Sequence, residues 1–442
     1  MQAADSPLLC VLRAAPRRFR MPALPPDAQA ARAAGPETAL AFAIEAARTG
    51  TAPPAGLQDL FTHALATSIR QALAPGGDAH FQAQVLRSTE ADVEAHARLA
   101  AGAAADRRAV RSATDAIAHP GKLRALEAPG PREALAHLHR LATQQDWEAL
   151  AHAAAALAVA DEDLRDASNG LAKHPALARL RQGAALRESA AVQHYLALCA
   201  QRGPAAGSEE AAAHGRASAR VGDAAEHLVA QALSQAAQWL DRHEEGQPHR
   251  VVRGLRTPAG FPAGSDKAKD EWDAAIVRRR GDAHDVVLLA EVKASPAAAT
   301  PDYGRLLRGL QRLAQAAPGA RYAFACVEGA VALHGDALRG LEPAGFQLPA
   351  HVIYCCAAQE THPPMLSAAA RAVLLGEPAS LGFARALAAG ESPPEAVLLP
   401  VWEALPTAVR LRSTWHQYDT ARAARAAMLH PQDLLAALAA AG

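Results

Sequence analysis

The stretch DVVLLAEVKAS, residues 285–295, limits the fold of this chain more than any other part of its sequence. An apolar run of this length, rich in Val and Leu, is typical of a buried β-strand. Side chains alternate between the two faces of a strand, so Leu289, Glu291 and Lys293 share one face, with successive members about 7 Å apart. Burying charged groups is costly unless they are paired. If this strand is buried, Glu291 and Lys293 therefore need charged partners or a function.

A second strand is predicted directly before this one, in EWDAAIVRR, residues 271–279. The connection RRRGDAHD is short and contains a glycine, which is typical of a β-hairpin. Antiparallel pairing would bring Asp273 beside Glu291, with Lys293 next to both. Two carboxylates at one point need a cation between them, and Mg²⁺ prefers carboxylate and carbonyl oxygens and water. Such an ion lowers the pKa of a bound water and neutralises charge on a phosphate, while the lysine can position or deprotonate that water.

The elements around the hairpin predict an α/β domain. A helix over about 216–242 precedes three strands, and the helix YGRLLRGLQRLAQAA follows them. Strands in RYAFACV and HVIYCCA come next, with a short helix in GDALRGL between them. The rest of the chain is rich in alanine, the best helix former, with breaks at Pro and Gly. We therefore predict a helical domain over 1–205, a linker over 206–215, an α/β domain over 216–360 and a helical extension over 361–442.

Asp273 followed by Glu291, Val292 and Lys293 resembles the motif of the PD-(D/E)xK nuclease superfamily, over roughly residues 216–357. The resemblance implies a restriction-endonuclease-like αβββαβ core. It also implies that Asp273 and Glu291 hold Mg²⁺, for which Mn²⁺ can substitute, together with the carbonyl of Val292. Lys293 would take the catalytic role of the family's lysine. Trp272 stands where the family name has a proline, a position that varies in such families.

The resemblance draws further residues into the predicted site. Similar nucleases often place a carboxylate on the first helix, where this chain has Glu226, and a Gln or basic residue on the helix after the motif, where it has Gln311. An ordinary solvated surface is the alternative for each position. The residues predicted to contact nucleic-acid phosphates are Arg305, Arg308, Arg312, Lys267 and Lys269.

Composition bounds the function. The formal net charge is zero, so nucleic acid would have to bind through a local patch. The five cysteines include no Cys-x-x-Cys pair, which favours reduced thiols in a cytoplasmic protein. No apolar run approaches the roughly 20 residues that span a bilayer. The N-terminal 22 residues are interpreted as a loose tail, because their basic residues follow the apolar patch.

The sequence therefore predicts a Mg²⁺-dependent nuclease that hydrolyses phosphodiester bonds, in DNA rather than RNA, within restriction, phage defence or repair. The helical N-terminal region would bind a protein partner or select the target. The alternative is a binding module that keeps the fold without the activity. The oligomeric state stays open, with a homodimer as one alternative.

Overall fold

We describe a computed structural model in which residues 6–51, 54–201, 203, 207–246, 248–262, 264, 268–359 and 362–442 are placed. The chain divides into two compact units. The sheet unit consists of residues 1–68, 206–380 and 394–442, and the helical unit consists of 69–205 and 381–393. This division differs from the predicted one, because residues 1–68 belong with the sheet rather than with the helical domain predicted over 1–205, and so do 361–380 and 394–442 of the predicted extension.

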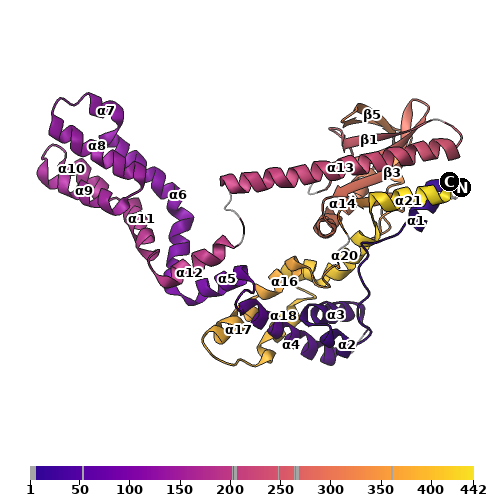
Figure 1. The fold of residues 1–442 in the computed structure, drawn as a ribbon, viewed down its shortest axis with the longest axis horizontal. Helices are drawn as coiled ribbons and strands as arrows, with labels where there is room; N and C mark the ends of the chain where they lie inside the picture. Colours follow the sequence, from indigo (N-terminus) through magenta and orange to yellow (C-terminus); the bar gives the residue numbers. More distant parts are fainter. Residues whose placement is uncertain are drawn as a thin grey trace. The chain divides into compact units, whose positions relative to one another are not determined.

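The sheet unit contains seven strands: β1 (His249–Arg256), β2 (Glu271–Arg280), β3 (Ala283–Lys293), β4 (Arg321–Cys326), β5 (Gly329–His334), β6 (Val352–Cys356) and β7 (Met428–Leu429). Their order is β2-β1-β4-β5-β3-β6-β7. Figure 1 labels β1, β3 and β5 of this sheet, together with helices α13 and α14. Strand β2 also pairs with β3, so the first five strands in this order close into a barrel. Strand β6 lies parallel to β3, and β7 continues the sheet beyond β6.

The fold is mixed α/β, as predicted, but the closed barrel was not expected. The sequence prediction missed two strands, the two-residue β7 and the longer β5. Strand β5 forms a hairpin with β4 through a turn at Val327 and Glu328, and Gly329 directly after the turn has a φ of 106°, in the region that favours glycine. The hairpin reaches β1 at one pair, Arg256 with Ala325, and β3 at another, His284 with Leu333. These two contacts close the barrel.

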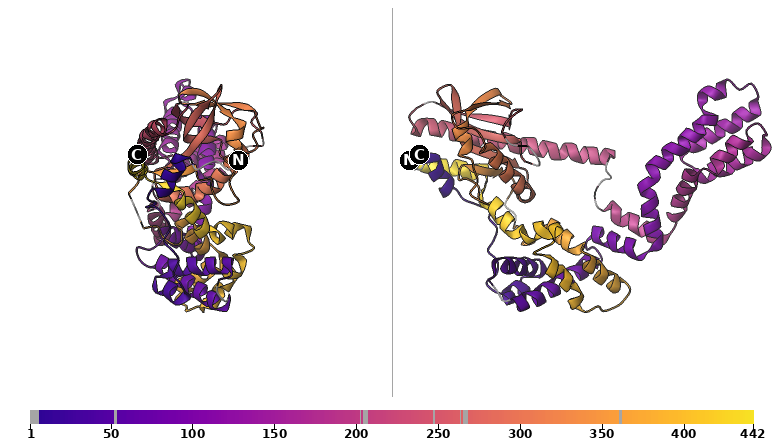
Figure 2. Two further views of the ribbon diagram at one scale, coloured as in Figure 1. Left: turned by 90° about the vertical axis from the view of Figure 1, so that its right-hand side faces the viewer. Right: turned by 180° about the vertical axis from the view of Figure 1, so that it is seen from behind.

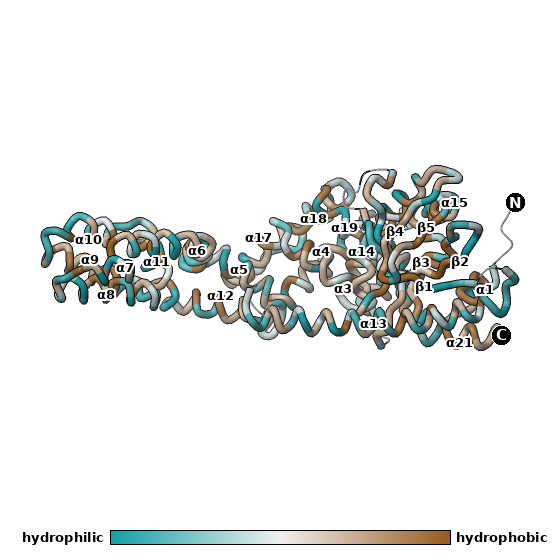
Figure 3. Tube along the Cα trace, turned by 90° about the horizontal axis from the view of Figure 1, so that it is seen from above, coloured by the Kyte–Doolittle hydropathy of each residue, from teal (hydrophilic) through white to brown (hydrophobic). Residues whose placement is uncertain are grey.

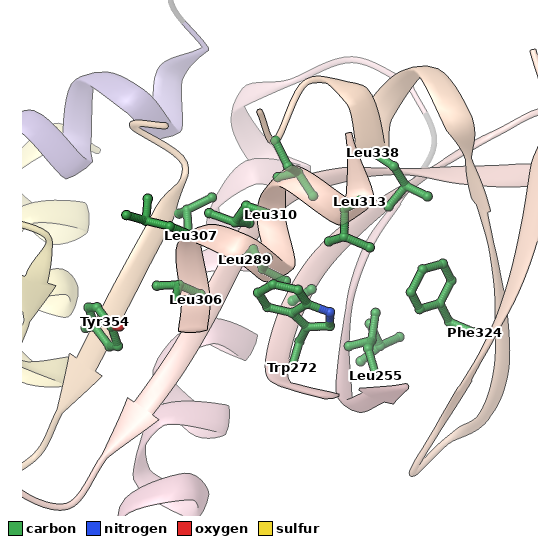
Figure 4. Packing of buried hydrophobic residues seen from close by; sticks show 14 of the residues in the cluster. Leu255, Trp272, Leu289, Leu306, Leu307, Leu310, Leu313, Phe324, Leu338 and Tyr354 are labelled. Atoms are coloured by element: carbon green, nitrogen blue, oxygen red, sulfur yellow. The ribbon is translucent and has the colours of Figure 1, made fainter. Parts of the chain in front are cut away.

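Helices cover both faces of the sheet. Helix α14 (Ala299–Leu313) packs Leu306, Leu310 and Leu313 on one face, in a cluster that includes Trp272 and Leu289 (Figure 4). The opposite face packs on the long helix α13 (Glu209–His243). It also contacts the terminal helices α1 (Pro7–Ala14) and α21 (Pro431–Ala441), which lie side by side (Figure 2). The interpretation of the N-terminus as a loose tail is therefore wrong for residues 7–14, because the apolar patch packs there.

The alternation along β3 decides where its charged residues lie. Leu288 and Ala290 belong to the cluster on the α13 face, and Leu289 belongs to the cluster on the α14 face. Glu291 and Lys293 have the parity of Leu289, so both charges lie on the α14 face. The apolar stretches of these strands are brown in Figure 3.

The remaining helices form two groups. Those of the sheet unit are α2 (Ala28–Ala33), α3 (Pro36–Thr49), α15 (Gly335–Arg339), α16 (Ala368–Leu375), α18 (Leu399–Ala404), α19 (Arg412–Trp415) and α20 (Gln417–Ala426). Those of the helical unit are α5 (Ala79–Thr89), α6 (Ala91–Ala118), α7 (Pro120–Arg124), α8 (Pro129–Gln144), α9 (Trp147–Ala160), α10 (Arg165–Ala172), α11 (Pro175–Leu186) and α12 (Ala190–Ala200). Helices α4 (Pro54–Leu73) and α17 (Pro378–Ala388) contribute to both. No helix in the placed residues is long and apolar enough to cross a bilayer.

Candidate active site

The predicted hairpin of β2 and β3 is present. Gly281 occupies the turn with a φ of 62°. Arg280 and Ala283, on either side of the turn, form the first pair of the ladder. The ladder runs to the pair of Ala274 and Ala290 and ends there. One residue further, the carboxylate oxygen Oδ2 of Asp273 accepts a hydrogen bond of 2.7 Å from the backbone amide of Val292. Asp273 thus takes the place of a backbone acceptor and lies beside the segment that carries Glu291.

Glu291 is the most enclosed acidic group of the site. The residue is 3% exposed, and both ammonium groups near it bind the same oxygen, Oε1. Lys269 Nζ lies 2.6 Å from that oxygen and Lys293 Nζ lies 2.7 Å from it. The other oxygen, Oε2, is buried and has no hydrogen-bond partner. A buried carboxylate oxygen with a free lone pair is a ready position for a cation or a donor.

Helix α14 contributes a second carboxylate to Lys293. Asp302 Oδ2 lies 2.9 Å from Lys293 Nζ, so this lysine bridges Glu291 and Asp302. The hydroxyl of Tyr354, on the parallel neighbour β6, lies 3.5 Å from the same Asp302 oxygen. The Tyr354 ring centroid lies 5.9 Å from Lys293 Nζ. These contacts fix the position of the ammonium group from three elements.

The same surroundings shift the pKa values of the site. Burial raises the pKa of Glu291 to about 7, and the charge of Asp273 adds to this rise, while Lys269 and Lys293 oppose it. Burial would lower the pKa of Lys293, but its bonds to Glu291 and Asp302 outweigh burial and raise that pKa. Partial burial and then the charge of Asp273 raise the pKa of Glu226. Lys293 is therefore cationic at neutral pH, and Glu291 titrates near neutrality.

Glu226 lies on α13 at the edge of the helix face that packs on the sheet. The residues of this part of α13 that pack on the sheet are Ala225, Val229, Ala232, Leu233, Ala236, Ala237, Trp239 and Leu240. The apolar residues Val221 and Leu228 of the same helix do not belong to this face and are 57% and 49% exposed. Because α13 packs Val229 against the sheet, Glu226 lies close enough to Asp273 for the two charges to interact.

Lys269 was predicted to contact phosphate from an exposed loop, and that position is wrong. The residue is 7% exposed, because its ammonium group is drawn to Glu291 and its backbone packs against α14. A β-carbon on Gly309 would lie 2.8 Å from the Lys269 β-carbon, so glycine is needed for this close approach. Lys267, predicted to act with Lys269, lies outside the described residues.

The later part of α14 is separate from the charged cluster. Gln311 is exposed and lies nine residues beyond Asp302, which corresponds to roughly 13 Å along a helix axis. Arg305 and Arg308 are exposed, as a phosphate-binding stripe requires. Arg312 departs from that stripe: it is half-buried, and its guanidinium carbon lies 5.8 Å from the centroid of the Phe261 ring. The structure thus brings Asp302, rather than Gln311, to Lys293.

The donor set fits a hard divalent cation in part. Asp273 and Glu291 are neighbouring carboxylates, and Oε2 of Glu291 lacks a partner. Oxygen donors of this kind suit Mg²⁺ or Mn²⁺, which complete their coordination with water. The described residues contain no cluster of three His, Cys, Asp or Glu side chains arranged around one ion position. Val292, predicted to ligate through its carbonyl, uses its amide to bind Asp273, and the role of its carbonyl stays a prediction.

Sequence reasoning missed Asp302 and misjudged Lys269. Asp302 stands in the first turn of α14, where an acidic residue favours the helix and therefore attracts no special interpretation. Lysine is rare in this chain, where only five of the 45 Lys and Arg residues are lysine, and this makes Lys269 notable. That rarity was the one signal available, and the partner of the lysine could come only from the three-dimensional structure.

Comparison of the chain with family models, with curated proteins and with solved structures gave no match.

Proposed function

We propose that the sheet unit is a metal-dependent phosphodiesterase that cleaves nucleic acid, DNA in preference to RNA. The observation that carries the proposal is the enclosed carboxylate of Glu291, which has a free oxygen and lies beside Asp273 and the ammonium group of Lys293. Paired carboxylates with an adjacent cation are what hydrolysis of a phosphodiester with a bound Mg²⁺ requires.

The connectivity supports a core of the PD-(D/E)xK type. Helix α13, the meander of β1, β2 and β3, helix α14 and strand β6 parallel to β3 follow the order αβββαβ. On this proposal the hairpin of β4 and β5 is an insertion between α14 and β6. It lies against the edges of β1 and β3. Asp273 and Glu291 stay at the ends of β2 and β3.

In the proposed reaction, Asp273 and Glu291 would hold the ion, which supplies an activated water and neutralises charge on the phosphate. Lys293 is held between two carboxylates and is cationic at neutral pH, so it supports the negative charge that develops on the phosphoryl oxygens. Asp302 positions Lys293 and touches no substrate. Lys269 neutralises Glu291 and would have to share that carboxylate with the ion.

The contact between Lys269 and Glu291 favours a second candidate function. Oε1 of Glu291 already accepts from two ammonium groups, so this carboxylate is neutralised without an ion. A module that binds protein or nucleic acid and has kept the fold without activity agrees with that balance.

Cleavage assays separate the two candidates. The full chain and Lys293→Ala are incubated with supercoiled plasmid, single-stranded DNA and RNA, each with Mg²⁺, Mn²⁺ or EDTA. We expect the wild type to cut with either metal, EDTA to abolish cutting, and Lys293→Ala to lose at least 100-fold in rate. Lys173→Ala, an exposed lysine of the helical unit, is the matched control and should cut as the wild type does. Cutting that persists in Lys293→Ala would exclude this site, and intact substrates in every condition would favour the module.

A further inference from the structure

A pocket of about 680 Å³ opens in the sheet unit, and Glu291 is not among its lining residues. Its walls come from the segment before α2, from α3, α14 and α20, and from the 346–353 segment that leads into β6. Ligand sites for small molecules usually fall between about 300 and 1,000 Å³. The size therefore suits a ligand rather than a single water or ion.

Positive charge exceeds negative charge on the wall of this pocket. Arg17, Arg48 and Arg422 line it, and Asp419 is the carboxylate that lines it with them. Asp419 is shared, at 2.8 Å from Arg422 and 3.7 Å from Arg48, and Arg48 also binds Glu45 at 2.7 Å. Three guanidinium groups thus face two carboxylates, so one positive charge is not matched.

Arg17 carries that unmatched charge. Its Nη2 donates to the backbone carbonyl of Leu12 at 2.8 Å, and its Nη1 is buried without a hydrogen-bond partner. Burial and the nearby Arg20 lower the pKa of Arg17, as expected for a cation that no anion compensates. A bound anion would restore the balance, and arginine suits phosphate because its planar donors bind two oxygens together.

The rest of the pocket is built for a flat, mostly apolar body. Phe346 is 40% exposed at the wall, and its ring centroid lies 5.2 Å from that of the buried Tyr303. Val352 and Ala427 add apolar wall, and Gln347 contributes a side-chain amide that can both donate and accept. Aromatic and apolar surface with a few polar groups is what binds a nucleobase by stacking and edge contacts.

We propose that this pocket binds a nucleoside phosphate, with the phosphate at the arginines and the base against Phe346. The site is separate from the proposed cleavage site and does not depend on it. Tyr303 of the pocket precedes Arg305 and follows Asp302 on α14, so the two sites share one helix.

Isothermal titration of the full chain with adenosine monophosphate, adenosine and inorganic phosphate tests the proposal. We expect the monophosphate to bind at least tenfold more tightly than either fragment. Arg422→Gln should weaken this binding at least fivefold, and so should Phe346→Ala. Arg250→Gln, an exposed arginine of β1 outside the pocket, is the matched control and should leave it unchanged.

Arg422 and Phe346 are both exposed, so the two variants should fold. Circular dichroism checks this. Lys293→Ala should bind the monophosphate as the wild type does, which separates this proposal from the proposed cleavage activity. Absence of binding at millimolar monophosphate, or equal binding by adenosine, or wild-type affinity in Arg422→Gln and Phe346→Ala, would overturn the proposal.

Discussion

Replacing Lys269 by methionine tests the charge balance around Glu291. The ammonium group lies 2.6 Å from Glu291 Oε1, with the two side chains 8% and 2% exposed. A hydrogen bond to a charged group contributes about 1.5–3 kcal/mol, and burial puts this one at the upper end. We therefore expect Lys269→Met to lose about 3 kcal/mol of stability at pH 8.5, where Glu291 is ionised.

The pH dependence follows from the pKa of Glu291, which burial raises from 4.5 to about 7. A carboxyl with a raised folded-state pKa holds its proton more tightly in the folded chain, so its ionisation lowers stability as pH rises from 4.5 to 7. In the wild type this cost is about 3 kcal/mol, and removing Lys269 enlarges it. At pH 5.5 Glu291 is protonated, the ion pair is absent, and Lys269→Met should cost less than about 1 kcal/mol.

Urea unfolding followed by tryptophan fluorescence measures this effect, because only Trp147 of the five tryptophans lies in the helical unit. Arg256→Met is the control: its ion pair with Glu271 is exposed and should contribute less than about 1 kcal/mol at either pH. A loss of equal size at pH 5.5 and pH 8.5, or none at pH 8.5, would refute the reasoning.

Three further substitutions test the site. Asp302→Asn should lower the pKa of Lys293, reduce the proposed cleavage rate about tenfold and shift its pH–rate profile to lower pH; an unchanged profile would remove Asp302 from the site. Asp273→Asn should keep or raise the metal-free melting temperature, because it relieves repulsion with Glu291; a marked drop would show that the carboxylate is structural. Gly309→Ala should cost about 1–3 kcal/mol in urea unfolding, because its β-carbon meets atoms at 2.8 Å; an unchanged midpoint would contradict the packing.

The strands that carry the site could be predicted because their apolar alternation and the turn glycine are local signals. Strands β2 and β3, their hairpin and the shared face of Glu291 and Lys293 all follow from such signals. Helix α14 and strand β6 were predicted for the same reason. The segment GAVALH of β5 is short and lies next to a glycine, so its pairing with β4 and the closure of the barrel were not evident.

The partners of the charged side chains could not be predicted, because they depend on tertiary packing. Asp302 lies 11 residues after Glu291 and Lys269 lies 22 residues before it, and both meet its cluster only when α14 packs on the sheet. The buried face of α13 is equally hard to predict, because alanine-rich helices offer several apolar faces of similar width. The sequence therefore predicted that Asp273, Glu291 and Lys293 lie together, and their further contacts depend on the fold.

Binding of Mn²⁺, followed by electron paramagnetic resonance, tests most directly whether Asp273 and Glu291 hold a divalent ion. We expect one site in the wild type, at least tenfold weaker in Glu291→Gln and Asp273→Asn, and retained in Lys293→Ala. Binding should weaken as pH falls below about 7, because a proton then competes with the ion for Glu291. Mn²⁺ that does not bind at millimolar concentration, or that binds equally well to Glu291→Gln, would contradict the account.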